Sequence, residues 1–178
     1  MKSRFIVDGM LGSLARKLRI FGYDTLYKAD LSDNEILEAA SGEGRTILTS
    51  DQKLADRASK RRINCILLND ESNDEARLAT VLRETGEEAA HLNPEETRCS
   101  VCNGEVEPVG RDEVAGAVPE GVLAKQEKFY RCKSCGKIYW IGGHWKRLNE
   151  LSANLKSNHQ NNNSKKPTSQ HNQPTTAI

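Results

Sequence analysis

The first half of the sequence alternates short β-prone segments with segments of helical periodicity, and this alternation restricts the possible fold more than any other feature. Strands are expected at "RFIVD", "DTLYKA", "RTILTS" and "INCILLN". Each is followed by a helix-like segment, namely "MLGSLARKLRIFG", "LSDNEILEAASGEG", "DQKLADRASKRR" and "NDEARLATVLRETG". In the first of these, Leu11, Leu14, Ala15 and Leu18 share one helix face. Four such repeats predict an α/β fold over residues 1–90, with a parallel sheet covered by helices.

Composition favours a folded protein without a membrane span. The chain is 37% hydrophobic and 29% charged, which is normal for a domain with a sizeable core. It has no run of 18 apolar residues and no signal-peptide profile at its start, so a cytoplasmic location is expected. The net charge is only +1, although "ARKLR" and "KLADRASKRR" are basic. Such runs are usually solvated helix faces, but they also permit a local nucleic-acid surface.

Four of the five cysteines form two C-x-x-C pairs, Cys99 with Cys102 and Cys132 with Cys135. Each pair places two thiolates on one turn, and two turns supply the four soft ligands of a tetrahedral Zn²⁺ site. The 29-residue gap between the pairs is longer than the usual ~15–20. A redox C-x-x-C is the alternative, but it usually occurs once, near a helix start. Four thiolates leave no open position, so a structural zinc ribbon is predicted over residues 95–150.

The rest of the chain carries weaker signals. Cys65 lies in the fourth predicted strand and is expected to be a buried, inert thiol. The segment between the C-x-x-C pairs is rich in Val, Gly and Glu and is broken by two prolines, which suggests short strands and loops without helix. A short helix is expected from about Trp145 to Leu155. Residues 156–178 are rich in Asn, Gln, Ser, Thr and Pro and are predicted to be a disordered polar tail.

Acidic residues follow two of the predicted strands. Asp8 ends the first strand, and Asp51 comes two residues after the third. Because parallel strands open their carboxyl ends on one crevice, these two carboxylates should be neighbours. The second helix begins at the same edge, which adds Asp33 and, as a further candidate, Glu35. Such a cluster would suit Mg²⁺ or Mn²⁺, although each aspartate alone is also well placed as a helix cap.

Basic and aromatic residues accompany these sites. Cations near the predicted acidic edge are Arg16, Arg19, Arg45, Lys53, Arg57, Lys60, Arg61 and Arg62. Carboxylates for a metal with cations nearby make a phosphodiester site plausible. The predicted ribbon contains the aromatic residues Phe129, Tyr130, Tyr139, Trp140 and Trp145. They could stack on bases, but most are expected to form the small core beside the zinc.

These motifs together resemble the PIN-like RNase family named after the C-terminal domain of the Mutator-seven exonuclease, in which a PIN domain is fused to a zinc ribbon. The resemblance rests on "FIVDGMLGSLARKLRIFGYDT", "SDNEIL", "GRTILTSDQKLADRA", "RCSVC" and "FYRCKSCGKIYWIGGHW". It implies a PIN-like three-layer sandwich followed by a four-cysteine zinc ribbon. It places Asp8, Asp33 and Asp51 on the family's acidic positions, and the four cysteines of the two pairs on its zinc ligands.

The resemblance implies a Mg²⁺- or Mn²⁺-dependent endoribonuclease, or at least an RNA-binding protein, acting on single-stranded or structured RNA. Asp8 and Asp51 would hold the ion, and Asp33 would complete its shell or orient the attacking water. The family's fourth acid matches only loosely, with Asp70 and Asp74 as candidates. A non-catalytic RNA-binding or adaptor module is the main alternative. A phosphoacceptor receiver domain ranks lower, because "VDGM" offers one acid where a pair is needed.

Overall fold

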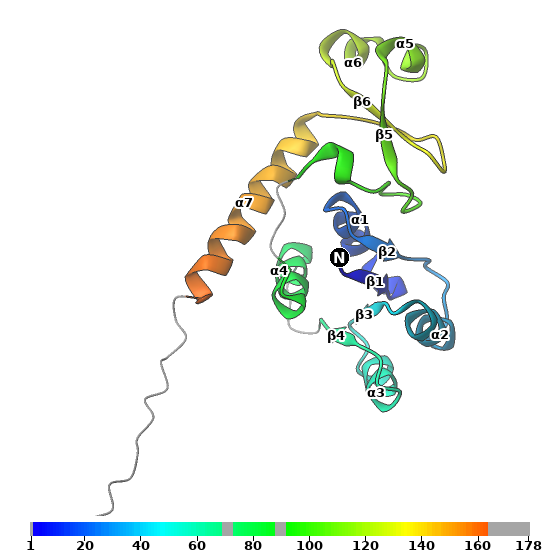
Figure 1. The fold of residues 1–178 in the computed structure, drawn as a ribbon, viewed down its shortest axis with the longest axis vertical. Helices are drawn as coiled ribbons and strands as arrows, with labels where there is room; N and C mark the ends of the chain where they lie inside the picture. The colour runs from blue at the N-terminus through cyan, green and yellow to red at the C-terminus, as the bar shows by residue number, and fades with distance from the viewer. Residues whose placement is uncertain (1, 69–72, 88–91, 164–178) are drawn as a thin grey trace, which may run out of the picture.

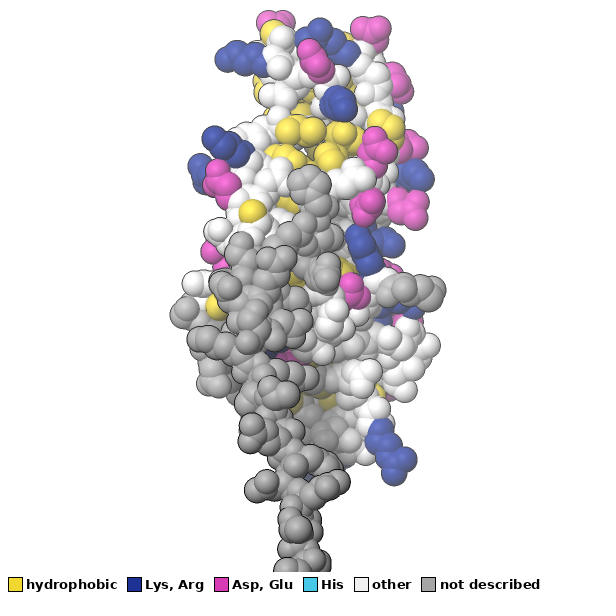
Figure 2. Space-filling view, turned by 60° about the vertical axis from the view of Figure 1, so that its left-hand side comes forward, with side chains coloured by type: hydrophobic (Ala, Val, Ile, Leu, Met, Phe, Trp, Pro, Cys, Tyr) yellow, Lys and Arg dark blue, Asp and Glu magenta, His cyan; other side chains and the backbone are white. Residues whose placement is uncertain are grey.

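The computed structural model describes residues 2–68, 73–87 and 92–163 (Figure 1), and side chains of both charges are interspersed on its surface (Figure 2). A parallel sheet of order β2-β1-β3-β4 is formed by β1 (Arg4–Val7), β2 (Asp24–Leu26), β3 (Thr46–Thr49) and β4 (Cys65–Leu67). All three strand pairings are parallel, and Val7 pairs with Leu48 at the centre of the sheet. The predicted α/β fold is confirmed.

Four helices cover the sheet, α1 (Gly12–Ile20), α2 (Asp33–Glu43), α3 (Gln52–Lys60) and α4 (Asp74–Thr85). A 3₁₀ turn, Gly9–Leu11, joins β1 to α1. Both α2 and α4 end on a glycine in the left-handed conformation, Gly44 and Gly86, which terminates the helix without strain. Helices α1 and α4 lie on one side of the sheet and α2 and α3 on the other, giving three layers (Figure 1).

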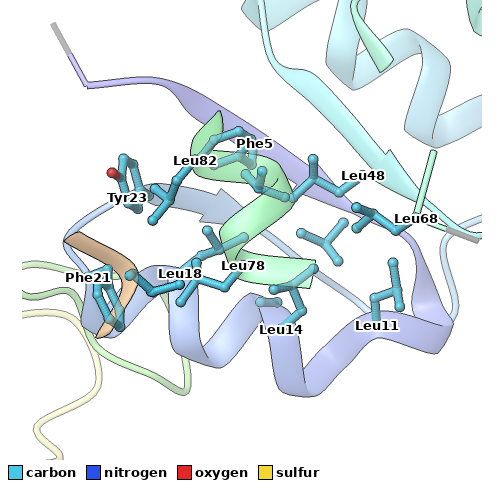
Figure 3. Close-up of a cluster of buried hydrophobic side chains, with 14 of the residues drawn as sticks. Phe5, Leu11, Leu14, Leu18, Phe21, Tyr23, Leu48, Leu68, Leu78 and Leu82 are labelled. Atoms are coloured by element: carbon cyan, nitrogen blue, oxygen red, sulfur yellow. The ribbon is translucent and has the colours of Figure 1, made fainter. Parts of the chain in front are cut away.

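The two faces of the sheet bury separate hydrophobic clusters, because successive strand residues point to opposite sides. Phe5 and Val7 of β1 face α1 and α4, whereas Ile6 faces α2 and α3. Figure 3 shows the first cluster, in which leucines of α1 and α4 meet between the helices and the sheet. The predicted helix face is confirmed, since Leu14 and Leu18 are fully buried there.

A second, antiparallel sheet of order β5-β6-β7 contains β5 (Val106–Val109), β6 (Phe129–Cys132) and β7 (Ile138–Trp140). We call this sheet and its connections the ribbon. Between β5 and β6 the chain forms two short helices, α5 (Arg111–Val114) and α6 (Glu120–Lys125). The expectation of strands and loops without helix was therefore wrong for this segment. Val114 and Val118 pack here against Phe129, so tertiary contacts stabilise turns whose local helical signal is weak.

The last described element is α7 (Gly143–Asn163), which follows β7 and packs against α4. Its residues Leu148, Leu151 and Leu155 belong to the hydrophobic cluster that α1 and α4 share. The helix continues past the predicted end near Leu155 to Asn163, so the first part of the predicted disordered tail is helical. The remainder of that tail, 164–178, lies outside the described residues. Within the described ranges, no helix is both long enough and apolar enough to cross a membrane.

Candidate functional site

The strand order creates a crevice at the carboxyl ends of β1 and β3. These two strands are neighbours, but the chain leaves β1 toward α1 on one face and leaves β3 toward α3 on the other face. Such a reversal is the usual ligand-binding position in open α/β sheets, because the diverging connections leave a gap between them. Asp8 and Asp51 occupy the ends of these two strands. Their predicted convergence on one sheet edge therefore follows from the observed topology.

Thr49 connects the two aspartates. Its hydroxyl donates a 2.8 Å hydrogen bond to Oδ2 of Asp8 and accepts a 2.9 Å bond from the backbone N–H of Asp51. Asp51 also caps α3, because its Oδ1 accepts a 2.7 Å bond from the backbone N–H of Lys53. The cap uses one carboxylate oxygen and leaves the other, Oδ2, for a ligand. The sequence analysis did not single out Thr49, although its position between the aspartates is the signal that could have found it.

Asp33 is the first residue of α2, and its carboxylate faces α3. Its Oδ2 lies 2.7 Å from the guanidinium of Arg57, which also contacts the side chain of Asn34. The further candidate Glu35 forms a capping box, because its carboxylate accepts bonds from the backbone and the hydroxyl of Ser32. Glu35 therefore completes the start of α2, and the hydrogen bonds from Ser32 lower the pKa of its carboxyl.

Of the two candidates for a fourth acid, Asp74 lies within the described residues and Asp70 does not. Asp74 begins α4 and is tied to Lys17 at 3.0 Å and to Arg77 at 3.2 Å. Burial raises the pKa of Asp74, but hydrogen bonds from Ser13, Lys17 and Arg77 outweigh it, so the pKa falls below its ordinary value. Its charge is thus already balanced by cations.

The aspartates do not form a ready-made metal cage in this arrangement of side chains. Among the described residues, the four cysteines are the one group of three or more potential ligands whose atoms all lie within 4.8 Å of one another. Asp8, Asp33 and Asp51 do not form such a group. A divalent ion between Asp8 and Asp51 fits the donor chemistry of the crevice, because carboxylate oxygens suit hard cations. The ion pair with Arg57 engages Oδ2 of Asp33, so this oxygen joins such a site only when the pair opens.

The cysteine cluster matches its prediction. Cys99 and Cys132 are buried, Cys102 and Cys135 are exposed, and all four sulfurs converge. The Sγ atoms of Cys99 and Cys135 are 3.6 Å apart, and those of Cys102 and Cys132 are 3.4 Å apart. A tetrahedral zinc with ~2.3 Å Zn–S bonds needs sulfurs at about 3.8 Å, so small side-chain adjustments would admit the ion. The cluster can therefore hold a structural zinc.

Each C-x-x-C pair sits on the same type of turn. The backbone N–H of the second cysteine points at the first sulfur at 3.5 Å in both turns, Cys102 to Cys99 and Cys135 to Cys132. The residue after the second cysteine adopts a left-handed conformation, with φ of 69° at Asn103 and 72° at Gly136. We call the two turns, residues 99–103 and 132–136, the first and second knuckles. Asn and Gly tolerate this conformation better than other residues, which explains their presence there.

The thiols of the cluster differ in acidity. Burial raises the pKa of Cys99, but hydrogen bonds from the Tyr139 hydroxyl and from backbone N–H groups outweigh it and lower the pKa to about 6. Burial and the neighbouring thiols raise the pKa of Cys102 to about 12. Four thiolates at this separation repel one another strongly. The cluster can carry its full negative charge only around a cation, which is what zinc provides.

The first knuckle docks on the edge of the parallel sheet. The side chain of Asn103 accepts a 2.9 Å bond from the backbone N–H of Thr25 in β2 and donates a 2.7 Å bond to Asp24. In return, the buried guanidinium of Arg19 in α1 donates to the carbonyls of Ser100 and Val101 at 3.1 and 3.0 Å. The knuckle therefore satisfies polar groups of β2 and α1 that would otherwise be buried without partners.

Asp24 is the charged centre of this junction. Arg45, itself buried, lies 2.9 Å from its carboxylate, and Arg4 lies 3.1 Å away. Burial raises the pKa of Asp24, but the bonds from Arg45, Asn103 and Arg4 together hold it well below its usual range. Asp24 is thus a structural carboxylate, whose bonds connect β2 to Arg4 in β1, to Arg45 before β3 and to the first knuckle.

A comparison with protein-family models gives a match to the Mut7-C RNAse domain over residues 3–152. The match includes both sheets and the four cysteines. It also includes Asp8, Asp33 and Asp51. Comparisons with curated proteins and with solved structures give no match.

Proposed function

The chain belongs to the Mut7-C RNAse domain family, and from this premise we propose that it is an endoribonuclease that depends on Mg²⁺ or Mn²⁺. The supporting observation is the pair of carboxylates at the β1–β3 crevice. Asp8 and Asp51 end adjacent strands and are connected through the Thr49 hydroxyl. This bond fixes Oδ2 of Asp8, and the helix cap fixes Oδ1 of Asp51, so each aspartate retains one oxygen for a ligand.

Asp8 and Asp51 are the residues that would hold the ion, and the bound ion would activate a water and stabilise charge on the scissile phosphate. Helices α1 and α3 begin close to the same crevice, and the positive ends of their dipoles favour an anion. Lys53 in the first turn of α3 is exposed and adds positive charge beside Asp51. These groups would orient an RNA phosphate so that a water can attack in line with the leaving 3′-oxygen.

Asp33 is assigned the supporting role of completing the shell or orienting the water. Its partner Arg57 is 37% exposed and the ion pair lies at the surface, where such pairs contribute about 0–1 kcal/mol. Opening the pair is therefore inexpensive, and a bound phosphate offers Arg57 another anionic partner. The zinc of the cysteine cluster is assigned a purely structural role, since four thiolates close its coordination shell.

The test is cleavage of a single-stranded RNA by the purified protein with added Mg²⁺ or Mn²⁺, against the same protein without added divalent ions. Omission is preferable to a strong chelator, which would also remove zinc. Asp8→Asn and Asp51→Asn should each abolish cleavage. Asn caps a helix as well as Asp does, so Asp51→Asn should fold normally. Asp56→Asn is the matched control, because Asp56 is an exposed residue of α3 that bonds only to Gln52 among described side chains.

Unchanged cleavage in a folded, zinc-loaded Asp51→Asn protein would refute this assignment. A non-catalytic RNA-binding or adaptor protein is the second candidate, and the Asp33–Arg57 ion pair favours it because one of the three acids is already neutralised. That candidate predicts RNA binding without added divalent ions and without dependence on Asp8 or Asp51. Absent cleavage with retained binding would therefore select it.

A further inference from the structure

We propose that a pocket between the ribbon and α7 binds an unpaired base of RNA. This inference rests on the proposed function only in taking RNA as the ligand. The pocket has a volume of about 180 Å³ and contains none of the acidic residues of the β1–β3 crevice. Its walls include the four aromatic residues Tyr130, Tyr139, Trp140 and Trp145. It is therefore a second site, on a different part of the chain.

The ribbon places these aromatics by its own alternation. Tyr130 and Tyr139 are register partners on β6 and β7, so their side chains lie on the same face of the sheet. The opposite face carries Phe129 and its register partner Trp140. Phe129 packs against α5 and α6 in the small core of the ribbon, whereas Trp140 is the last residue of β7 and lines the pocket from the end of that strand. The expectation that most ribbon aromatics form a small core beside the zinc therefore fits Phe129, whereas other rings line an open pocket.

The size of the pocket restricts its occupant. Pockets for drug-sized ligands measure about 300–1,000 Å³, so this one suits a single flat ring system. Aromatic walls bind any base through its π-face, which is how proteins hold single-stranded nucleic acid without reading its sequence. Ile20 and Leu148, which lie under the pocket on α1 and α7, make its floor apolar.

Polar groups at the pocket favour a nucleotide over an apolar peptide side chain. Arg98 is the charged residue among those that line the pocket. Its Nη1 donates to the Asn103 carbonyl at 2.9 Å, which holds the positive charge of the guanidinium beside the pocket for an adjacent phosphate. The Tyr139 hydroxyl is held by Cys99 Sγ at 3.0 Å and by the Ser100 hydroxyl at 3.3 Å, which fixes the ring in the pocket wall. Lys137 does not line the pocket, but its ammonium lies 5.7 Å from the centre of the Tyr139 ring and adds a second cation close to this wall.

The pocket also has an exposed rim. Trp140 is 38% exposed and Ile141 is 36% exposed, and both are large hydrophobic residues that line the pocket. Figure 2 shows hydrophobic side chains exposed in the upper part of the molecule, where the ribbon lies, with Lys, Arg, Asp and Glu side chains around them. An apolar surface within a charged border is typical of a binding site.

The two tryptophans give a direct assay, because Trp140 and Trp145 are the only tryptophans of the sequence and both line the pocket. The experiment titrates the full-length, zinc-loaded protein with a single-stranded oligo(U) RNA of about 10 nucleotides, without added Mg²⁺ or Mn²⁺. A duplex RNA of the same length is the comparison. We expect the single strand to quench tryptophan fluorescence as it binds and the duplex to leave it unchanged.

Variants distinguish binding of RNA at the pocket from a general affinity of the protein for RNA. Trp140→Ala should weaken binding of the single strand about 5- to 150-fold, the usual loss for one stacked base, and Trp140→Phe should lose less. Val101→Ala is the matched control, because Val101 is another exposed hydrophobic residue of the ribbon but does not line the pocket. Zinc content and far-UV circular dichroism verify that each variant is folded.

The proposal is overturned if the single strand does not bind, if it binds without quenching, or if the duplex quenches equally well. It is also overturned if folded Trp140→Ala binds within twofold of wild type, in which case the pocket is available to a peptide instead. Its failure is distinct from that of the proposed function. Asp51→Asn tests cleavage alone and should retain the quenching, whereas Trp140→Ala tests base binding alone.

Discussion

Replacing Asn103 by Gly should destabilise the parallel-sheet domain, although Asn103 belongs to the zinc ribbon. The substitution removes the side chain that bonds to Thr25 and Asp24. Thr25 is fully buried, so its backbone N–H would lose its partner inside the protein, at a cost of about 1–3 kcal/mol. Asp24 keeps its arginines and some contact with water, so loss of its bond adds only about 1 kcal/mol.

Backbone effects nearly cancel in this variant. Glycine adds about 0.5–1 kcal/mol of unfolded-state entropy, but it relieves a similar strain, below about 1 kcal/mol, because Asn tolerates the left-handed conformation at a φ of 69°. The net expected loss is about 2–4 kcal/mol of the free energy of unfolding. For a protein of this size, that loss corresponds to a fall in Tm of roughly 5–15 °C. Urea denaturation followed by far-UV circular dichroism measures the free energy, and calorimetry measures the Tm.

Gly136→Asn is the matched control for Asn103→Gly. Gly136 holds the same position in the second knuckle, with a φ of 72° and no atom within 4 Å of the site of an added Cβ. The exchange should change stability by less than about 1 kcal/mol, because Asn tolerates this conformation. Both variants should keep a full complement of zinc. A loss below 0.5 kcal/mol in zinc-loaded Asn103→Gly would refute the reasoning that the first knuckle completes the edge of the sheet.

Three further perturbations have defined outcomes. Asp24→Asn should lower the free energy of unfolding at pH 7 and make that free energy fall less steeply in acid. The folded pKa of Asp24 lies below its unfolded value of about 3.9, so the stability that the carboxylate contributes is lost as the pH falls below about 3.9. Urea midpoints measured between pH 7 and 2 test this. Cys132→Ser should abolish zinc binding and unfold the ribbon, whereas Cys65→Ala should retain one zinc, as measured by elemental analysis. Leu14→Ala should cost about 2–5 kcal/mol, and Met10→Ala, at an 85% exposed position, less than about 0.5 kcal/mol, both by urea denaturation.

The elements of the parallel sheet were predictable because each carries its own local signal. The central strands β1 and β3 are mostly buried and read as apolar runs, and the helices show a continuous apolar face such as that of Leu14 and Leu18. The short helices α5 and α6 were not predictable, since four and six residues hold too little periodicity for a helical pattern. They form because Val114 and Val118 pack against Phe129, and this contact joins separate parts of the chain.

The candidate site, like the fold, was predictable from the sequence only in part. The shared edge of Asp8 and Asp51 follows from parallel topology, which the sequence pattern predicts. The Thr49 bond and the Asp33–Arg57 pair do not follow from it, because they depend on rotamers and on the distance between two helices. The four-cysteine cluster was predictable from spacing alone, but the docking of the first knuckle on β2 was not. Spacing defines a turn, and it carries no information on which surface the turn contacts.

That docking joins the ribbon to the parallel-sheet domain, although the chain pattern changes near residue 93. Edge strands expose unpaired backbone groups, and here the ribbon side chain of Asn103 covers one of them on β2. The buried guanidinium of Arg19 depends on ribbon carbonyls for two of its bonds. Helix α7 then returns to bury Leu148 and Leu151 in the core of α1 and α4. Removing everything after residue 93 would therefore take away two of the three acceptors of the Arg19 guanidinium and uncover the core of α1 and α4. Folding of the ribbon and stability of the parallel sheet are thus linked through one shared interior.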